Sequence, residues 1–284
     1  MLFSDYRSDT FDELIDVDGH PRDAAASLVK HLERMGIEEL EARQQAANLG
    51  IEAAGITFTV YSEGTGIDRA WPFDIVPRVI SRRDWDRVEA GLVQRLTALN
   101  HFIADVYGEQ RIFAEGIVPR ALVDDSPGYR PECAGATPAH GVWAHICGSD
   151  LVRGKDGTIY VLEDNLRVPS GISYVVENRR AMTRVFPELF ASHRIRRVDA
   201  YPMRLLEALR RTAPEGVTDP CVVVLTPGVH NSAYFEHSFL AQQMGVELVE
   251  GQDLFVQNDT VYMRTTRGPR RVHVIYRRVD DDFL

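Results

Sequence analysis

The segment GSDLVRGKDGTIYVLEDN, residues 148–165, constrains the fold of this chain more than any other stretch. Its Asp156–Gly157 dipeptide is typical of a two-residue type I′ hairpin loop, because both central residues of that loop need a positive φ. Two antiparallel strands are therefore predicted, with the polar run Glu163–Asn165 ending the second strand. The register that such a loop imposes pairs Lys155 with Thr158, Arg153 with Tyr160, Leu151 with Leu162 and Asp150 with Glu163.

The pairing of Asp150 with Glu163 predicts two carboxylates side by side on one face of the hairpin. Their Cβ atoms would lie about 5 Å apart, and like charges directly opposite each other destabilise a sheet. Asn165 projects from the same face, and apolar neighbours on both faces predict that the pair is partly desolvated. Protonation of one acid, an intervening arginine or a divalent cation would each relieve the repulsion.

The oxygen-only donor set favours a hard cation. Two carboxylates and one amide are too few for an all-protein calcium cage, but they suit magnesium, which takes its remaining ligands from water and nucleotide phosphates. The hairpin therefore predicts a Mg²⁺–nucleotide site. A surface hairpin with an arginine-paired acid cluster is the alternative that the residues leave open.

Helical periodicity dominates the chain before this hairpin. Apolar residues at helical spacing predict helices over residues 22–53, with a break at Gly36. β-Branched and aromatic residues around Gly64–Gly66 predict another hairpin within residues 56–80. Ser81 begins a long helix with a capping box and an apolar stripe that is expected to be core. That stripe consists of Trp85, Val88, Leu92, Leu96, Leu99 and Ile103.

The C-terminal part alternates between strand and helix patterns. Residues 172–214 are helical and rich in arginine, and from Cys221 the order strand, loop, helix, strand predicts a βαβ unit. The fold class is therefore mixed α/β. Three segments are expected: an N-terminal helical region with a β-hairpin over 1–115, a metal-binding lobe over 116–212, and the βαβ unit over 213–284.

Two further places are candidates for ligand contact. The loop TPGVHNS follows a strand and opens a helix, so its backbone N–H groups could bind an anion, with His230 and Asn231 at the mouth. A capped strand-to-helix turn is the alternative there. Arg179 and Arg180 directly follow the turn after the hairpin and could attract phosphates or an acidic substrate, whereas the neighbouring arginines read as solvated helix faces.

Composition excludes several classes of function. Acidic residues outnumber basic ones by 42 to 32, which argues against binding to a nucleic-acid backbone. No apolar run approaches the roughly 20 residues that span a bilayer, and the first residues do not resemble a signal peptide, so a cytoplasmic location is expected. Three scattered cysteines exclude a disulfide framework.

The hairpin and the turn after it resemble a known family. Asp150, then Glu163 and Asn165, then Pro169–Gly171 are similar to the metal segment of ATP-grasp ligases, although those usually have an arginine where this chain has Gly148. With YVLEDNLRVPSGISYVVENR and VIYRRVDDDF, the whole chain resembles circularly permuted ATP-grasp proteins of type 2, the glutathionylspermidine-synthase-like group. The resemblance implies an ATP-grasp fold with a Rossmann-like pre-ATP-grasp unit.

The same resemblance implies an activity and a set of roles. Such ligases use ATP to phosphorylate a carboxylate, and an amine then attacks the acyl phosphate to form an amide-like bond. The implied cofactors are Mg²⁺ and ATP, and the partners are small-molecule or peptide carboxylates and amines. The residues that the resemblance implies are Asp150, Glu163 and Asn165 for the metal and Arg167, Ser170 and Gly171 beside the acyl phosphate. The other candidates are Arg153, Arg179 and Arg180 for the nucleotide and His230 and Asn231 for the substrate.

The lysines separate two hypotheses. Family members hold the nucleotide with lysines from a second lobe, and this chain has only Lys30 and Lys155, neither at a suitable place. In a permuted chain that lobe would follow residue 284, so the chain is expected to be the first part of a longer protein.

The first hypothesis is an ATP- and Mg²⁺-dependent carboxylate–amine ligase, and the second is a truncated or degenerate half that binds a partner without catalysis. A Mg²⁺-dependent phosphohydrolase would need a water-activating base that the sequence does not reveal.

Overall fold

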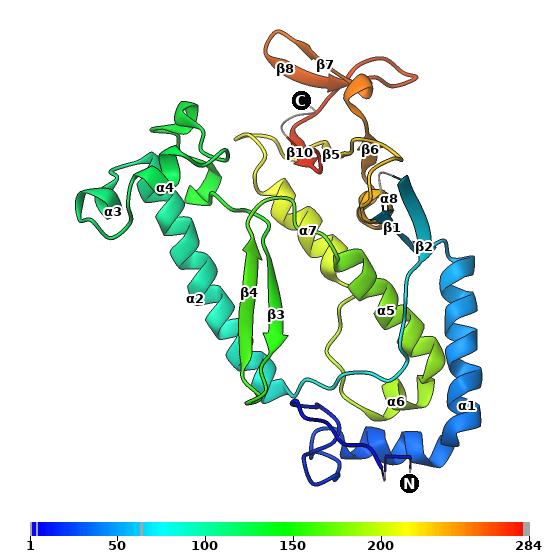
Figure 1. Cartoon of the computed structure of the whole chain (residues 1–284). Coiled ribbons are helices and arrows are strands. Elements are labelled where there is room, and N and C mark those ends of the chain that lie inside the picture. The colour runs from blue at the N-terminus through cyan, green and yellow to red at the C-terminus, as the bar shows by residue number, and fades with distance from the viewer. Residues whose placement is uncertain (1, 4, 63–64, 281–284) are drawn as a thin grey trace. The chain divides into compact units, whose positions relative to one another are not determined.

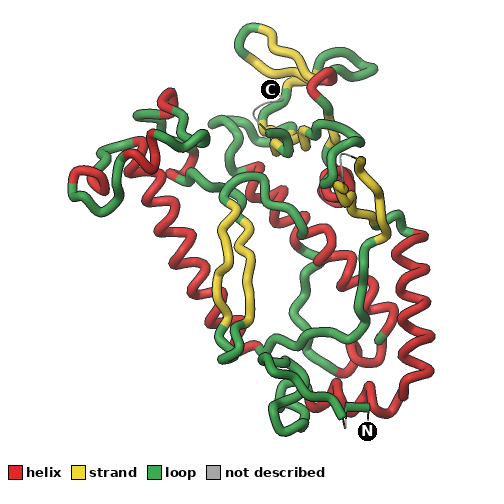
Figure 2. The backbone as a smooth tube through the Cα atoms, in the orientation of Figure 1, coloured by secondary structure: helices red, strands yellow, loops and turns green. Residues whose placement is uncertain are grey.

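The computed structural model describes residues 2–3, 5–62 and 65–280. The chain divides into two compact units. One unit comprises Met1–Val79 and Ser170–Leu284, and the other comprises Ile80–Pro169. These boundaries differ from the three segments expected from the sequence, and that division into three stays a prediction. Figures 1 and 2 show the course of the chain and its secondary structure.

The Ile80–Pro169 unit is built on one long helix and one hairpin. Figure 2 shows the hairpin strands side by side. Between the helix and the hairpin the chain forms short helical turns and loops, as the Pro- and Gly-rich composition predicts. The elements are α2 (Arg82–Tyr107), α3 (Arg111–Ala114), α4 (Ala121–Asp124), two 3₁₀ turns (Pro131–Cys133 and Ala139–Gly141), β3 (Gly148–Arg153) and β4 (Ile159–Asn165).

Helix α2 begins where the sequence predicts. The Ser81 hydroxyl accepts a hydrogen bond from the Asp84 N–H at 3.1 Å, which satisfies one of the free N–H groups at the helix start. The apolar stripe expected to be core is only half-buried, and Val106 is the residue of α2 that is buried. A two-stranded hairpin is too narrow to cover a helix of 26 residues, so the prediction of a buried stripe is wrong.

The hairpin forms, but its loop differs from the predicted one. Gly157 has a φ of 81°, whereas Asp156 is not among the residues with positive φ, so the loop is not type I′. The loop spans residues 154–158 and is closed by a bond from the Gly154 N–H to the Thr158 carbonyl at 2.8 Å. The predicted pairs near the loop are wrong: the structure pairs Arg153 with Ile159, Val152 with Tyr160 and Leu151 with Val161.

A bulge restores the predicted pairing at the other end of the hairpin. The register shifts between Asp150 and Leu151, so that Asp150 faces Glu163 and Gly148 faces Asn165. One extra residue on β4 is accommodated there, as in other β-bulges. The prediction that Asp150 opposes Glu163 is therefore confirmed.

The other unit holds the helices and the parallel sheet. Its N-terminal hairpin is confirmed, although Gly64 of the predicted turn lies outside the described residues. The elements are α1 (Ala26–Ala53), β1 (Thr57–Ser62), β2 (Thr65–Ala70), α5 (Ile172–Val185), α6 (Pro187–Ser192), α7 (Tyr201–Arg210), β5 (Val222–Leu225), α8 (Tyr234–Met244), β6 (Glu247–Val249), a 3₁₀ turn (Gly251–Asp253), β7 (Leu254–Gln257), β8 (Thr260–Met263), β9 (Arg270–Arg271) and β10 (Val274–Arg277).

Helix α1 breaks at the predicted glycine. Gly36 has φ 76° and ψ 172°, a conformation outside the helical region that only glycine adopts readily. Figure 1 shows α1 as two rods that meet at a corner. Both rods contribute to one core, which includes Leu28, Leu32, Leu40 and, from α5 and the turn into α6, Val185 and Phe186.

The predicted βαβ unit is confirmed. Strands β5 and β6 are parallel and joined by α8, and β10 adds to the other side of β5, giving the order β10–β5–β6. All four residues of β5 are buried, which explains their continuous Val and Leu pattern. Among the described residues, no helix is both long and apolar enough to cross a membrane.

Candidate functional site

The end of the β3–β4 hairpin brings the three predicted metal residues together. Asp150 and Glu163 are direct register partners, and Asn165 follows on the Glu163 side of β4. The Asn165 Nδ2 donates to Glu163 Oε1 at 3.0 Å, so the amide and the carboxylate share one face. Both carboxylates are exposed, and the expected partial desolvation is wrong because the described hairpin has no third strand beside it.

Asp164, which lies between Glu163 and Asn165, has a different role. Its carboxylate accepts from the Ser149 hydroxyl at 2.6 Å and from Arg95 Nε of α2 at 2.5 Å, and its side chain is 7% exposed. The Ser149 hydrogen bond, followed by the Arg95 bond, lowers the pKa of Asp164 below its usual value. The alternation of side chains along β4 therefore points one acid to the helix and leaves Glu163 and Asn165 on the other face.

The backbone at Gly148 passes close to the ring of Pro169. A Cβ atom at this position would lie 2.7 Å from the Cβ of Pro169, which is closer than real contacts allow. The Pro169 ring thus occupies the space that a side chain at position 148 would need. The arginine that the sequence resemblance leads us to expect at this position does not fit here unless the turn at Pro169 moves.

Arg153 lies at the loop end of the hairpin. Its Nη1 donates to the Gly157 carbonyl at 2.8 Å, and its Nη2 lies 3.6 Å from Asp84 Oδ2 of α2. The side chain is 8% exposed. Arg153 lies three positions after Asp150 on the same strand, a span of about 10 Å. Its predicted contact with the nucleotide stays a prediction, and so does that of Arg167, which is exposed on the segment after β4.

Ser170 and Gly171 lead into α5 in the other unit. Gly171 is the N-cap of α5 with φ 111°, and Ser170 is exposed. The Gly171 N–H donates to Glu236 Oε2 at 2.6 Å, and the Ser173 N–H and hydroxyl donate to the same oxygen at 3.1 and 2.9 Å. The first turn of α5 is therefore capped by a carboxylate from α8.

The guanidinium groups of Arg179 and Arg180 have partners within their own unit. Arg179 donates to the Arg196 carbonyl at 2.5 Å, and burial lowers its pKa. Arg180 donates to Glu177 at 2.5 Å and to Gln243 Oε1 of α8 at 2.7 Å. These bonds stabilise α5, and the predicted role of both arginines in nucleotide binding stays a prediction.

His230 and Asn231 lie in the loop at the carboxyl end of β5. His230 is exposed, and the Asn231 side chain accepts from the Ala233 N–H at 2.9 Å. Strand β5 is the central strand of the parallel sheet, with β6 and β10 on its two sides, and ligands of open α/β sheets bind outside such strand ends. The position of this loop at the end of β5 favours contact with a ligand. The bond from the Ala233 N–H to Asn231 also fits the alternative, a capped strand-to-helix turn without a ligand.

The sequence did not reveal a buried ion pair beside this loop. Glu236 Oε1 accepts from Arg278 Nη2 at 3.0 Å, and the two residues are 1% and 3% exposed. Arg278 belongs to the VIYRRVDDDF stretch, of which Asp281, Asp282 and Phe283 lie outside the described residues. The only available signal was a lone acid in the first turn of α8.

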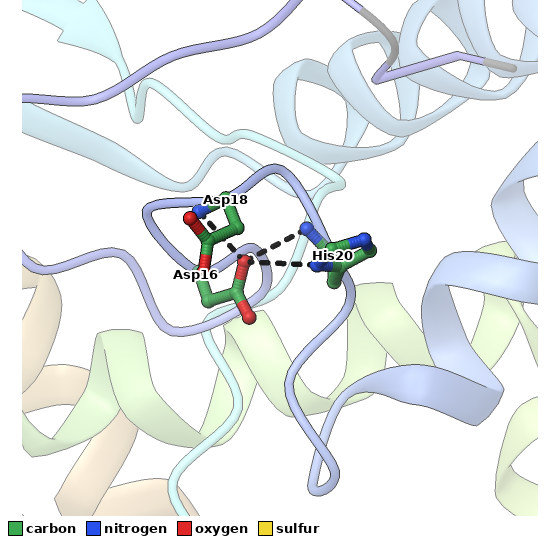
Figure 3. Close-up of side chains that lie close together, drawn as sticks. All are labelled: Asp16, Asp18 and His20. Atoms are coloured by element: carbon green, nitrogen blue, oxygen red, sulfur yellow. Dashed lines mark hydrogen bonds and ion pairs between the residues drawn. The ribbon is translucent and has the colours of Figure 1, made fainter.

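A second group of potential metal ligands lies near the N-terminus. Asp16, Asp18 and His20 each offer a ligand atom within 4.8 Å of the others (Figure 3). Asp16 Oδ1 already accepts from the backbone N–H groups of Asp18 and His20 at 3.0 and 2.8 Å. These bonds lower the pKa of Asp16 and describe a side-chain-capped turn, so the arrangement by itself does not identify a metal site.

Comparison with known proteins supports the ATP-grasp interpretation. Residues 77–284 match the model of the family "Circularly permuted ATP-grasp type 2". The chain is also similar in structure to a glutathione synthetase-like effector of Globodera pallida solved in its apo form, with a TM-score of 0.55, 14% identity, and coverage of 87% of this chain and 59% of that one. That likeness supports the fold alone.

Bacterial relatives cover nearly the whole chain. An uncharacterized protein of Synechocystis is 52% identical over 96% of this chain and 57% of its own length, and one of Mycobacterium tuberculosis is 51% identical over 99% and 50%. A Frankia alni protein named "Putative glutamate--cysteine ligase 2-3" is 44% identical over 100% of this chain and 33% of its own length. The chain thus spans about half of the first two relatives and a third of the last. The matched residues include the β3–β4 hairpin, the turn after it and the βαβ unit, and on this ground the chain belongs to the circularly permuted ATP-grasp family of type 2.

Proposed function

We propose that this chain carries the magnesium- and ATP-binding part of a carboxylate–amine ligase. The observation that carries the proposal is the register at the end of the β3–β4 hairpin, where Asp150 faces Glu163 and the Asn165 amide adjoins Glu163. Two exposed carboxylates held opposite each other repel, and a cation between them would remove the repulsion. Membership of the ATP-grasp family supports the same assignment.

The residues present fit a hard divalent cation. Asp150, Glu163 and Asn165 offer carboxylate and amide oxygens, and the exposure of the two carboxylates leaves room for the water and phosphate oxygens that complete a magnesium shell. Asp164 does not join them, because Ser149 and Arg95 hold it on the other face. When bound, Mg²⁺ would neutralise charge on the phosphates of ATP.

The proposed reaction balances as two displacements. A substrate carboxylate oxygen attacks the γ-phosphorus of ATP, the bond to the bridging oxygen breaks, and ADP leaves. The nitrogen of an amine then attacks the acyl carbon, inorganic phosphate leaves, and the amine loses a proton as the C–N bond forms. Holding the reacting groups together supplies most of the rate in such transfers.

The chain's own residues would bind and orient the substrates. We assign the contact with the transferred phosphoryl group to Arg167 and Ser170, with Arg153, Arg179 and Arg180 as further basic residues near the nucleotide. Gly171 would supply the turn rather than a hydrogen bond, since its N–H already donates to Glu236. His230 and Asn231, at the carboxyl end of β5, would contact the acid or amine substrate.

The substrates can be proposed only as a chemical class. The Frankia relative's name refers to glutamate and cysteine, but two thirds of that protein lies outside the match, so the name does not assign this chemistry to the matched part. We propose small-molecule or peptide carboxylates and amines as substrates. A cytoplasmic location and the absence of nucleic-acid partners stay predictions.

Trapping the acyl phosphate tests the proposal. Hydroxylamine is a strong amine nucleophile, so the chain incubated with MgATP, hydroxylamine and a mixture of the protein amino acids should release ADP and form hydroxamate in equal amounts. Glu163→Gln should abolish both products, whereas Glu207→Gln, an exposed carboxylate on α7, should leave them unchanged.

The alternative function is a non-catalytic binding half. Neither lysine suits the nucleotide in the structure: Lys30 is exposed on α1 and Lys155 is exposed in the hairpin loop. MgATP binding without ADP or hydroxamate would favour this alternative. ADP release without hydroxamate would instead favour hydrolysis and contradict the ligase.

A further inference from the structure

The start of α5 is capped in an unusual way. The N-cap residue Gly171 has no side chain that could accept hydrogen bonds from the first N–H groups of α5. Instead, Glu236 from α8 accepts the Gly171 N–H, the Ser173 N–H and the Ser173 hydroxyl, all on its Oε2. A residue 65 positions away thus fixes the turn that the proposed function places beside the transferred phosphoryl group.

The remaining oxygen of this carboxylate is bound as well. Glu236 Oε1 accepts from Arg278, which directly follows β10, and Arg278 also donates to the Tyr276 hydroxyl at 3.1 Å. Both charges are almost fully buried, at 1% and 3% exposure. Burying an ion pair carries a large desolvation cost, whereas a serine or threonine at the N-cap position would cap the helix without a buried charge.

Glu236 lies where it can connect the start of α5 with the start of α8. Glu236 lies in the first turn of α8, directly after the loop at the carboxyl end of β5 that holds His230 and Asn231. Its carboxylate therefore joins the N-terminal ends of α5 and α8, both of which favour a negative charge. The link fixes the Ser170–Gly171 turn relative to the proposed substrate loop within one unit.

We propose that Glu236, held by Arg278, is a positioning residue that keeps the Ser170–Gly171 turn in place for phosphoryl transfer. The proposal rests on the proposed ligase function. Glu236 is too buried to reach a substrate itself, so it acts through the two backbone N–H groups and the Ser173 hydroxyl. Loss of its charge should slow turnover without weakening MgATP binding, because the proposed metal ligands lie on β3 and β4 whereas Glu236 bonds to α5 and to Arg278.

The test combines hydrogen exchange with kinetics on the whole chain. In Glu236→Gln, the amides of Gly171 and Ser173 should exchange at least about 10-fold faster, while amides in β5 keep their rates. With MgATP, hydroxylamine and the amino-acid mixture, kcat should fall about 10- to 100-fold and KM for MgATP should stay within about twofold. Glu207→Gln is the matched control and should change none of these quantities.

Two further variants keep the test valid if Glu236→Gln folds poorly. Ser173→Ala removes one of the three donors and no charge, so it should fold and show a smaller effect in the same direction on exchange and kcat. Glu236→Gln combined with Arg278→Gln removes both buried charges together. It should unfold at a higher temperature than Glu236→Gln alone, yet keep the fast exchange and the low kcat.

The outcomes separate this proposal from the proposed function. Unchanged exchange at Gly171 and Ser173 would overturn the capping, and faster exchange with an unchanged kcat would overturn the positioning role. A rise in KM equal to the fall in kcat would also overturn it, because Glu236 would then affect binding. A parent chain that forms neither ADP nor hydroxamate would overturn ligase activity of this chain and with it the catalytic role of Glu236, while exchange would still decide whether Glu236 holds the turn.

Discussion

Asp164 shows how one position along a strand decides the role of a carboxylate. It stands between two proposed metal ligands in sequence, but its side chain points to the opposite face and bonds to Ser149 and Arg95. The acid, acid, amide run at the end of β4 therefore performs two tasks. Glu163 and Asn165 face one side for the proposed metal, and Asp164 fastens the hairpin to α2.

Replacing this fastening acid should destabilise the Ile80–Pro169 unit. Asp164→Asn is expected to lower the free energy of unfolding by about 1–3 kcal/mol at pH 7, because it weakens hydrogen bonds to a charged group. Asp86→Asn, which removes an exposed acid paired with Arg82 on the same helix, should cost less than about 1 kcal/mol. Urea unfolding followed by circular dichroism measures both, and equal effects would contradict the account.

The stability difference between the parent chain and Asp164→Asn should depend on pH in one direction. The pKa of Asp164 is lowered in the folded chain, so its contribution to stability is present above the ordinary aspartate pKa of about 4 and is lost as the pH falls through the lowered value. The difference between the parent chain and Asp164→Asn should accordingly shrink as the pH falls below about 4. A difference that grows on acidification would reverse this sign.

At the scale of elements, the hairpin was predicted correctly at one end through two compensating errors. The sequence predicted a two-residue loop and no bulge, whereas the structure has a longer loop and a bulge beside Asp150. Asp156 accepts from the Thr158 N–H and hydroxyl instead of adopting positive φ. Side-chain bonds of this kind select the loop, and no periodic pattern encodes them.

Helix α1 offers a direct test of an element that the sequence did predict. Gly36→Ala should destabilise the chain by about 1–3 kcal/mol, because φ 76° with ψ 172° is strained for any residue with a Cβ. A Cβ there meets nothing within 4 Å, so the cost is one of backbone conformation alone. Thermal unfolding of Gly36→Ala and of the parent chain measures this loss of stability.

Gly50 is the matched control in the same helix. It lies in the regular part of α1, with open space around a Cβ, so Gly50→Ala should stabilise the chain by about 0.5–1 kcal/mol. Opposite signs for the two substitutions would support the break at Gly36. Stabilisation by both would mean that α1 is one continuous helix.

At the scale of the whole molecule, the sequence predicts the local elements and misses the long-range polar bonds. Strands, helices and the βαβ order follow from period and turn residues, and the pairing of Asp150 with Glu163 follows from strand alternation. The bonds of Glu236 to Gly171 and to Arg278 join residues 65 and 42 positions apart. No local pattern marks such partners, so packing alone reveals them.

Buried His237 should make the stability of the Ser170–Leu284 part depend on pH. Burial, with a smaller effect of Arg278, lowers its pKa to about 4, while its ring bonds to the Thr226 hydroxyl at 2.9 Å. Because the unfolded residue has a pKa near 6.5, its contribution is present above that value and is lost as the pH falls toward 4. The loss should reach about 3 kcal/mol relative to His237→Gln.

Unfolding of both chains across this pH range checks the prediction. His20→Gln serves as a control, since that side chain is 77% exposed. The stability of His237→Gln should fall less steeply than that of the parent chain between pH 6.5 and 4. Parallel curves would show that His237 does not stay neutral in the folded chain.

Binding of a paramagnetic metal tests the central claim most directly. Mn²⁺ replaces Mg²⁺ at oxygen sites and broadens the amide NMR signals of nearby residues, so Mn²⁺ with ATP should broaden Asp150, Glu163 and Asn165 first. Excess Mg²⁺ should reverse the broadening, and Glu163→Gln should abolish it. Broadening confined to the Asp16–His20 turn, or unchanged in Glu163→Gln, would contradict a nucleotide-bound metal at the end of the β3–β4 hairpin.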